Sequence, residues 1–238
     1  MIKISVLLLA GGLGSRLYPL TYIFPKILIK YKNKNLLNHH LESLRYIKIK
    51  DIYLNLLNRY FYKFFKNKIP RSINIIEENA VSGSGGALAK LIKLDQTKTD
   101  LLVVFSDTLF PKEQNKIIKN MIRNRNKNKI SISISKIERL YDKKSKGLIK
   151  MQGDKIVSFN EKPKYILNES NYFFSGLVLI PYQLKSKVLY ELNRKKNKIT
   201  DFSSDILTSK KFKINVLKTK TIPKDFGDWP NIIKNLIK

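Results

Sequence analysis

The residues best suited to chemistry in this 238-residue chain gather around a glycine-rich stretch near its start. Gly11, Gly12 and Gly14 interrupt an apolar run, and because they lack a Cβ they let backbone N–H groups come close to a ligand. Arg16 and Lys26 follow in the same stretch, I-K-I-S-V-L-L-L-A-G-G-L-G-S-R-L-Y-P-L-T-Y-I-F-P-K. Two cations beside accessible amides suit a polyphosphate anion.

The glycine spacing excludes two better-known phosphate-binding loops. A P-loop needs G-x-x-x-x-G-K-[ST], and no Lys-Ser or Lys-Thr follows these glycines. A dinucleotide fingerprint needs G-x-G-x-x-G, and here the third glycine is missing. The stretch instead resembles the signature of the sugar-1-phosphate nucleotidylyltransferases, A-G-G-x-G-x-R-L-x-P-L-T followed by P-K.

This resemblance implies a fold, a reaction and a cofactor. The fold would be an α/β, Rossmann-like, three-layer nucleotidyltransferase fold with a mixed, mostly parallel central sheet, formed by residues 1–238 as a single nucleotidyltransferase domain. The reaction would be NTP + sugar 1-phosphate → NDP-sugar + pyrophosphate, with Mg²⁺ as cofactor. Arg16 and Lys26 would neutralise the triphosphate and then the leaving pyrophosphate, which gives both a catalytic role.

A second glycine loop, S-G-S-G-G-A, follows a strand predicted over Ser72–Glu77 and precedes a helix predicted over Ala87–Leu94. The N-terminal end of a helix suits an anionic or sugar-bearing ligand. In the resembled family, a segment like L-G-T-G-G-A holds the nucleoside and sugar. The resemblance therefore implies a nucleotide-binding set from both loops: Ala10, Gly11, Gly12, Leu13, Gly14, Ser84, Gly85 and Gly86.

Two carboxylates are the expected metal ligands. Asp107 follows the strongly apolar segment Asp100–Phe105, and the carboxyl ends of parallel strands are where open α/β sheets bind ligands. Most members of the resembled family have glycine where this chain has Ser106. The segment D-F-G-D-W-P-N resembles the family's terminal D-x-G-T-P-E motif, which implies that Asp225 is the second ligand. Because the match is partial, Asp228 stays open as the competing ligand.

Further motifs bear on the sugar. Glu161 and Lys162 belong to an E-K-P segment that resembles the family's sugar-phosphate motif. The resemblance implies that Lys162 binds the phosphate as a third catalytic cation and that Glu161 binds a sugar hydroxyl. Gly176 lies in the strand predicted over Tyr172–Ile180 and would lie beside the sugar. Many relatives have Asn where this chain has Phe174, so the identity of the sugar cannot be transferred.

The composition excludes several other chemistries. The chain has no cysteine, hence no disulfide framework, thiolate metal site or cysteine nucleophile. Its two histidines, His39 and His40, are adjacent, which disfavours a zinc centre or a histidine-based triad. We expect His40 to be packed or partly exposed on a helix. The chemistry must therefore come from Asp, Glu, Lys and Arg.

The chain is strongly basic, with a formal net charge of +29 and a pI near 10.1. Lysine is spread along the whole chain, which indicates a global compositional bias and no nucleic-acid partner. The charge would still attract nucleotides and sugar phosphates. We find no apolar run long enough to span a bilayer and no signal-peptide pattern, so we expect a cytoplasmic protein without a membrane partner. A homo-oligomer remains open.

The residues above depend on elements that the hydrophobic pattern predicts. Apolar runs rich in branched side chains predict buried strands over Ile4–Leu9, Asp51–Leu57 and Asp100–Phe105. Strict alternation in Ile130–Lys136 predicts a half-buried strand with a polar face. A basic helix is predicted over Glu113–Asn128.

The motifs leave the substrates open between two pairs. The loop S-G-S-G-G-A resembles that of heptose enzymes, whereas P-L-T after Arg16 and the F-S-G triplet at Gly176 point away from them, the triplet towards enzymes that make UDP-N-acetylmuramate. We favour GTP with a heptose or mannose 1-phosphate over UTP with an N-acetylated sugar 1-phosphate. The product would serve synthesis of surface polysaccharide or cell-wall precursors. The alternative function is a non-catalytic, nucleotide-sugar-binding regulatory protein of the same fold.

Overall fold

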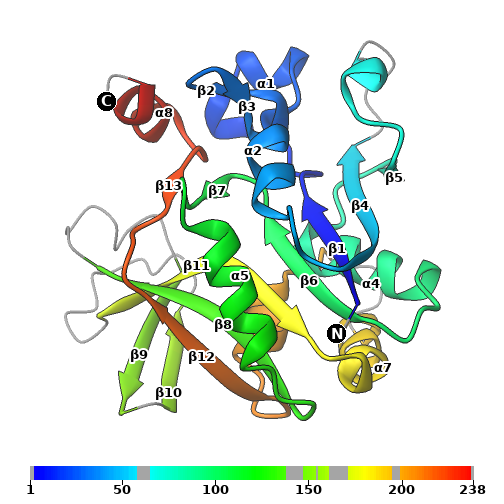
Figure 1. Cartoon of the computed structure of the whole chain (residues 1–238), viewed down its shortest axis with the longest axis vertical. Coiled ribbons are helices and arrows are strands. Elements are labelled where there is room, and N and C mark those ends of the chain that lie inside the picture. The colour runs from blue at the N-terminus through cyan, green and yellow to red at the C-terminus, as the bar shows by residue number, and fades with distance from the viewer. Residues whose placement is uncertain are drawn as a thin grey trace.

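A nine-stranded mixed sheet forms the centre of the structure, a computed structural model that describes residues 3–57, 65–137, 147–153, 155–160, 171–194 and 199–236 (Figure 1). β1 (Ile4–Leu9) runs parallel between β4 (Ile49–Leu57) and β6 (Asp100–Phe105). β5 (Ile73–Glu78) continues the parallel order on the far side of β4. The carboxyl ends of four neighbouring strands therefore meet along one edge.

The other half of the sheet introduces antiparallel pairs. β11 (Tyr172–Ile180) pairs antiparallel with β6 and with β8 (Lys129–Lys136), and β12 (Lys213–Thr219) runs parallel to β8. A hairpin of β9 (Leu148–Gln152) and β10 (Lys155–Asn160) pairs with the start of β11. The mixed, mostly parallel sheet confirms the predicted fold class.

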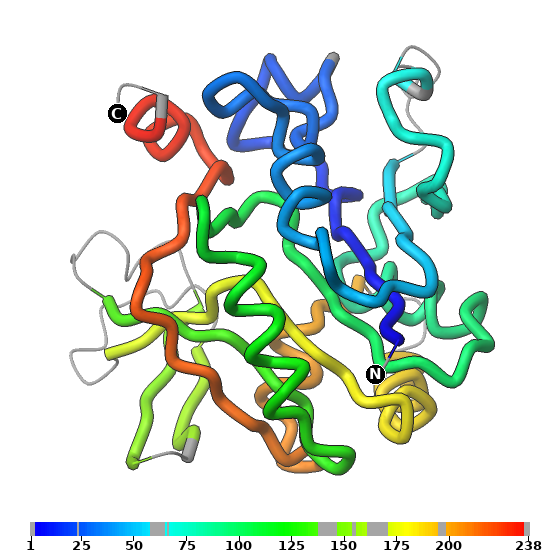
Figure 2. Tube along the Cα trace, in the orientation of Figure 1, coloured from blue at the N-terminus to red at the C-terminus, as the bar shows by residue number. Residues whose placement is uncertain are grey.

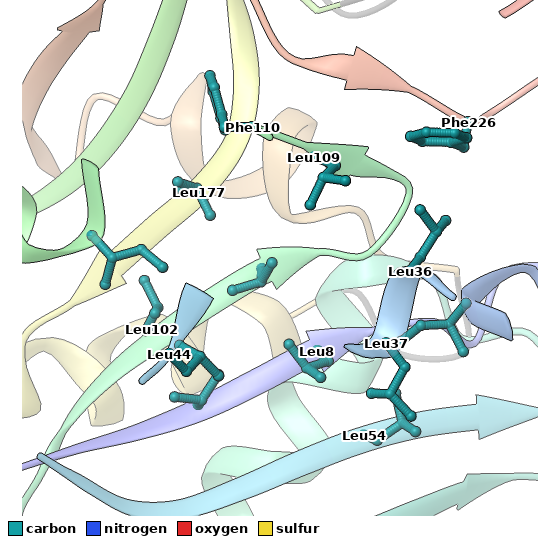
Figure 3. Packing of buried hydrophobic residues seen from close by; sticks show 14 of the residues in the cluster. Leu8, Leu36, Leu37, Leu44, Leu54, Leu102, Leu109, Phe110, Leu177 and Phe226 are labelled. Carbon is teal, nitrogen blue, oxygen red and sulfur yellow. The ribbon is translucent and has the colours of Figure 1, made fainter. Parts of the chain in front are cut away.

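Helices cover both faces of this sheet. α2 (Leu36–Ser43) and α5 (Gln114–Arg123) pack on the face that carries Leu8 and Leu102 (Figure 3). α4 (Gly83–Leu94), α7 (Tyr182–Asn193) and a π-helical turn (Ser203–Leu207) pack on the opposite face, with Leu7 and Val103. Because both faces of β1 and β6 are buried, these strands are apolar at nearly every position rather than alternating; Ser5 and Asp100 are the exceptions, and both are buried.

Short elements complete the chain at the strands' carboxyl ends. The segment after β1 contains a 3₁₀ turn (Ser15–Leu17), α1 (Leu20–Ile23), a second 3₁₀ turn (Lys26–Leu28), β2 (Lys30–Tyr31) and β3 (Lys34–Asn35). A further 3₁₀ turn (Lys66–Lys68) precedes β5, and β7 (Thr108–Leu109) follows β6. The last described elements are β13 (Lys224–Asp225) and α8 (Trp229–Leu236). The C-terminal segment returns to the segment after β1 (Figure 2). There Trp229 Nε1 donates to Tyr18 O at 3.2 Å.

Three predicted elements differ from the structure. α4 begins at Gly83, so the second glycine loop forms the first turns of the helix instead of preceding it. α5 ends at Arg123, well before Asn128. The serines of β8 are buried, with Ser133 fully inaccessible, so the predicted polar face does not meet solvent. Their hydroxyls bond to neighbouring strands; Ser133 Oγ accepts from Leu177 N–H at 3.2 Å.

No helix in the described part of the chain is long and apolar enough to cross a membrane.

Candidate active site

An open cleft lies at the carboxyl ends of β6, β1, β4 and β5. The empty space between its lining residues, which is open to solvent, amounts to about 630 Å³. The lining residues are Leu9, Ala10, Gly11, Gly12, Lys26, Asn55, Glu78, Val81, Gly83, Ser84, Phe105, Ser106 and Asp107. The structure thus brings together six predicted site residues: Ala10, Gly11, Gly12, Lys26, Ser84 and Asp107.

Hydrogen bonds from side chains of neighbouring strands fix the first glycine loop, and the sequence pattern did not identify these side chains. Ala10 N–H donates to Asn55 Oδ1 at 2.8 Å, and Asn55 Nδ2 donates to Glu78 Oε2 at 2.9 Å. Ser82 Oγ donates to Glu78 Oε1. A Cβ on Gly11 would lie 2.2 Å from Asn55 Nδ2 and 2.5 Å from Glu78 Oε2, so only glycine fits there. The sequence did offer one sign of these residues, because Asn55 and Glu78 are polar residues near the carboxyl ends of apolar strands.

Beyond Gly11 the loop opens and then turns. A Cβ on Gly12 would meet no described atom within 4 Å, which leaves that side accessible. Gly14 adopts a left-handed conformation with φ 63°, and its carbonyl accepts from Thr21 Oγ1 at 2.6 Å. Leu13 is exposed. Leu13 and Gly14 do not line the cleft as described; they direct the chain towards Arg16.

Lys26 and Asp107 form an ion pair inside the cleft. Lys26 Nζ lies 3.0 Å from Asp107 Oδ2, and the two side chains are 16% and 32% exposed. Burial raises the pKa of Asp107, but the Lys26 ammonium and the Arg16 guanidinium lower it by more, so the pKa lies below its ordinary value. Asp107 is therefore a carboxylate at neutral pH, and both charges remain partly accessible.

A short antiparallel ladder brings the two predicted metal ligands onto neighbouring segments. β13 pairs with β7, with Asp225 opposite Thr108, and Phe226 N–H donates to Asp107 O at 2.8 Å (Figure 1). Asp225 Oδ1 also accepts from Gly227 N–H at 2.6 Å. Residues far apart in the sequence thus meet beside the cleft.

Arg16 and Asp228 lie at the same end of the site. Arg16 Nη1 is 3.5 Å from Asp228 Oδ2, and the Arg16 side chain is 52% exposed. Asp228 caps α8, because its Oδ1 accepts from Asn231 N–H at 3.0 Å. A Cβ on Gly227 would lie 3.2 Å from Arg16 Nη2, so this glycine makes room for the guanidinium. Asp228 therefore has a structural role as the cap of α8.

The second glycine loop contributes to the cleft through its first residues. Ser84 lines the cleft, while its Oγ donates to Asp201 Oδ2 and accepts from Phe202 N–H, both at 2.8 Å. Gly85 N–H donates to Thr200 O at 2.9 Å, so this amide is already engaged. Neither Gly85 nor Gly86 lines the cleft as described.

The predicted sugar-binding residues are only partly described. Gly176 has φ 85°, and a Cβ there would lie 3.0 Å from Thr108 Cβ, which places this glycine against the residue after Asp107. It occupies the irregular stretch between Phe174 and Val178 in the pairing of β11 with β8. Glu161 and Lys162 lie outside the described residues.

The Asp107 and Asp225 carboxylates suit a hard divalent cation whose remaining ligands would be substrate phosphate oxygens and water. In the described part of the chain, no group of three His, Cys, Asp or Glu side chains could form a complete protein cage for a metal. Mg²⁺ commonly binds through one or two carboxylates and completes its shell with phosphate oxygens and water. Asp107 and Asp225 match that donor set.

Comparisons with known proteins identify the family. The family model described as nucleotidyl transferase matches residues 5–236. Mannose-1-phosphate guanylyltransferase 1 of Arabidopsis thaliana is 29% identical over 197 residues, covering 77% of this chain and 52% of that protein. The chain thus spans about half the length of this relative. CTP:phosphoglutamine cytidylyltransferase of Campylobacter jejuni is 27% identical, covering 79% of this chain and 78% of that protein.

Solved structures confirm the fold. A putative glucose-1-phosphate thymidylyltransferase from Bacillus anthracis superposes with a TM-score of 0.80 at 18% identity, covering 99% of this chain and 94% of that one. The sequence-based recognition is therefore confirmed, and this chain belongs to the nucleotidyl transferase family.

Proposed function

We propose that this protein transfers a nucleotidyl group from an NTP to a sugar 1-phosphate and releases pyrophosphate. The observation that carries the proposal is the cleft, in which an open glycine loop, an accessible lysine and a carboxylate meet beside Arg16. We further propose that residues 1–238 act as one domain, in the cytoplasm, without nucleic acid or membrane as a partner.

The strand order supports one orientation for the nucleotide. The cleft extends from Asp107 after β6, past Gly11 after β1, to Glu78 at the end of β5. Three strand spacings amount to about 14 Å, comparable with an extended nucleoside triphosphate. With the cations at the Asp107 end, the phosphates would lie there and the base near Glu78 and Val81.

The reaction needs no side-chain nucleophile. The sugar phosphate oxygen is ionised at neutral pH and would attack the α-phosphorus in line, so the bond from that phosphorus to the pyrophosphate oxygen breaks. Holding both polyanions in position can contribute about 7–11 kcal/mol. Lys26 and Arg16 would neutralise the triphosphate and then the departing pyrophosphate. Amides of the first glycine loop would line the same phosphates.

Mg²⁺ is the proposed cofactor, held by Asp107 and Asp225. When bound, it would orient the phosphate oxygens and offset their charge. We favour Asp225 over Asp228, because Asp225 matches the first aspartate of the family's terminal motif and its strand β13 pairs with β7, directly after Asp107. Lys162, Glu161 and Gly176 are proposed to bind the sugar phosphate and the sugar.

For the substrates we favour GTP with a mannose or heptose 1-phosphate. The Arabidopsis relative is described as a mannose-1-phosphate guanylyltransferase. The product would serve polysaccharide or cell-wall precursor synthesis. The Campylobacter relative, described with phosphoglutamine, makes other phosphorylated acceptors worth including.

The test is pyrophosphate release with Mg²⁺ from GTP, UTP, CTP, dTTP and ATP against a panel of sugar 1-phosphates and phosphoglutamine. We expect release that needs one NTP and one acceptor and disappears in Asp107→Asn. Nucleotide binding without turnover across the whole matrix would contradict the proposal and favour a non-catalytic regulatory protein.

A further inference from the structure

A buried histidine lies behind the Asp107 segment. His40 on α2 is fully inaccessible, and both of its ring nitrogens lie within hydrogen-bond distance of partners. His40 Nε2 is 3.0 Å from the carbonyl oxygen of Ser106, and His40 Nδ1 is 2.9 Å from Gln114 Nε2. Gln114, on α5, is also buried.

The partners determine every donor and acceptor in this cluster. The Ser106 carbonyl can only accept, so His40 Nε2 carries the proton and His40 Nδ1 accepts from Gln114. The orientation of the Gln114 amide agrees, because its Oε1 accepts from Phe110 N–H at 3.2 Å while its Nε2 also donates to Ser43 Oγ at 3.0 Å. Ser43 Oγ then donates to His40 O at 2.6 Å. Burial lowers the pKa of His40 to about 4, so the ring is neutral.

The cluster contacts the backbone on both sides of Asp107, the proposed metal ligand. His40 holds the carbonyl of Ser106, immediately before Asp107, and Gln114 holds the amide of Phe110, after β7. Ser106 Oγ donates to Leu9 O at 2.5 Å, which ties the same point to β1. The serine that replaces the usual glycine of the family thus adds a further anchor.

We propose that His40 and Gln114 are positioning residues that fix the segment Ser106–Phe110, so that Asp107 points into the cleft and β7 pairs with β13. The inference rests on the proposed function for its catalytic readout. A histidine that only filled the core would need neither the contact with the Ser106 carbonyl nor the one with the Gln114 side chain, and an apolar side chain would fill the same space at lower desolvation cost. Neither residue reaches the substrates; each acts through the backbone that carries Asp107.

The test compares His40→Leu with His40→Gln. Leucine removes both ring contacts, whereas a glutamine amide can donate to Ser106 O and accept from Gln114. Losing the support behind a metal ligand typically weakens metal affinity or activity about 10- to 100-fold. We expect His40→Leu to lower kcat and raise the Mg²⁺ concentration for half-maximal rate by about tenfold or more, with the KM for NTP changed less than about threefold. His40→Gln should recover most of both losses.

Two controls separate positioning from folding. His39→Gln alters the adjacent histidine, whose Nε2 contacts Tyr31 O, and should leave kcat and the Mg²⁺ requirement unchanged. Thermal melting of each variant reports stability. If His40→Leu melts earlier but keeps its kcat and Mg²⁺ requirement, or if His40→Gln fails to recover them, the positioning role is wrong.

A readout without turnover keeps this test distinct from the test of the function. Mn²⁺ binding in the presence of NTP can be followed by water-proton relaxation in the wild type and each variant. If the wild type binds Mn²⁺ and NTP without turnover, the proposed reaction fails, whereas weaker Mn²⁺ binding by His40→Leu alone still supports positioning. Equal Mn²⁺ affinity in the wild type and His40→Leu would overturn it.

Discussion

The two glycine loops are similar in sequence, but their glycines have different surroundings in the structure. In the first, Gly11 lies against Asn55 and Glu78, and the loop beyond it opens towards the cleft. In the second, Gly83 and Gly85 lie against the backbone of Thr200, inside the first turns of α4. In the first loop Gly12 thus leaves space open beside the cleft, whereas the glycines of the second loop allow close packing of chain segments. Changes in the second loop and its helix should therefore affect stability, and changes in the first should affect nucleotide binding.

The largest stability effect is expected at the far end of α4. Lys185 Nζ lies 3.0 Å from Asp95 Oδ2, both side chains are almost fully buried, and Asp95 directly follows the helix. Lys185→Met would leave a buried carboxylate without its cation, which costs about 3–5 kcal/mol. Urea denaturation at neutral pH measures the loss in unfolding free energy. An unchanged NTP affinity in the folded variant would support the contrast, and a lost affinity would contradict it.

The same ion pair gives a pH dependence. Burial raises the pKa of Asp95, but hydrogen bonds from Thr97 and Lys185 lower it by more, so its folded pKa lies below its ordinary value. Its contribution is therefore present above the unfolded pKa of about 3.9 and is lost as pH falls through the folded pKa. In Lys185→Met the remaining burial should move acid unfolding to higher pH. Circular dichroism along a pH series would show the shift, and coincident curves would contradict it.

In the first loop, Gly11→Ala should affect binding most. The added Cβ would overlap Asn55 Nδ2 and Glu78 Oε2, and overpacking of this kind costs about 1–3 kcal/mol in stability. Displacing the loop should also weaken NTP binding by at least about tenfold, measured by calorimetry. Gly12→Ala is the matched control for the stability loss alone, because its Cβ would meet no described atom within 4 Å. Native NTP affinity in Gly11→Ala would contradict the role given to this loop.

Asn55→Leu should produce a smaller effect of the same kind. It removes the acceptor for Ala10 N–H and the donor to Glu78. Leaving a buried group without its partner costs about 1–3 kcal/mol. The KM for NTP should rise more than kcat falls, since the change loosens the nucleotide loop and leaves Lys26 and Asp107 in place. Steady-state kinetics separates the two, and a fall in kcat alone would argue against it.

The smallest effect is expected for Ser84→Ala in the second loop. The hydroxyl links α4 to Asp201 and Phe202 N–H, and a net hydrogen bond contributes about 0.5–1.5 kcal/mol. The melting temperature should fall slightly with little change in NTP affinity. A selective loss of affinity would show that Ser84 binds the nucleotide directly, as the family resemblance implied, and would weaken the contrast between the loops.

The strands and the first loop could be predicted because their signals are local. Apolar, branched runs gave the bounds of Ile4–Leu9 and Asp100–Phe105 as the structure has them, and the family resemblance gave those of Tyr172–Ile180. Asp107 followed from its place after a central strand. These features depend on neighbours in the sequence, which a pattern contains.

The remaining features depend on contacts between distant segments. Glycine disfavours helices, so α4 was predicted to begin later, but packing against Thr200 overrides that preference. Alternation in β8 could not show that its serines would bond to neighbouring strands. Asn55, Glu78 and His40 carried no local sign of the atoms they contact. The assignment of Asp225 came from resemblance to a motif, and its role as a ligand stays a prediction.

One pair of proteins, measured for both binding and turnover, tests most directly whether nucleotidyl transfer occurs in the cleft around Asp107. Wild type and Asp107→Asn would be compared for NTP binding by calorimetry and for pyrophosphate release with Mg²⁺ and the acceptor that the substrate matrix identifies. We expect NTP binding by both proteins, with pyrophosphate release by the wild type and at least about a 100-fold lower rate in Asp107→Asn. Equal rates in the two proteins would contradict it, because the cleft described here would then not be where the reaction occurs.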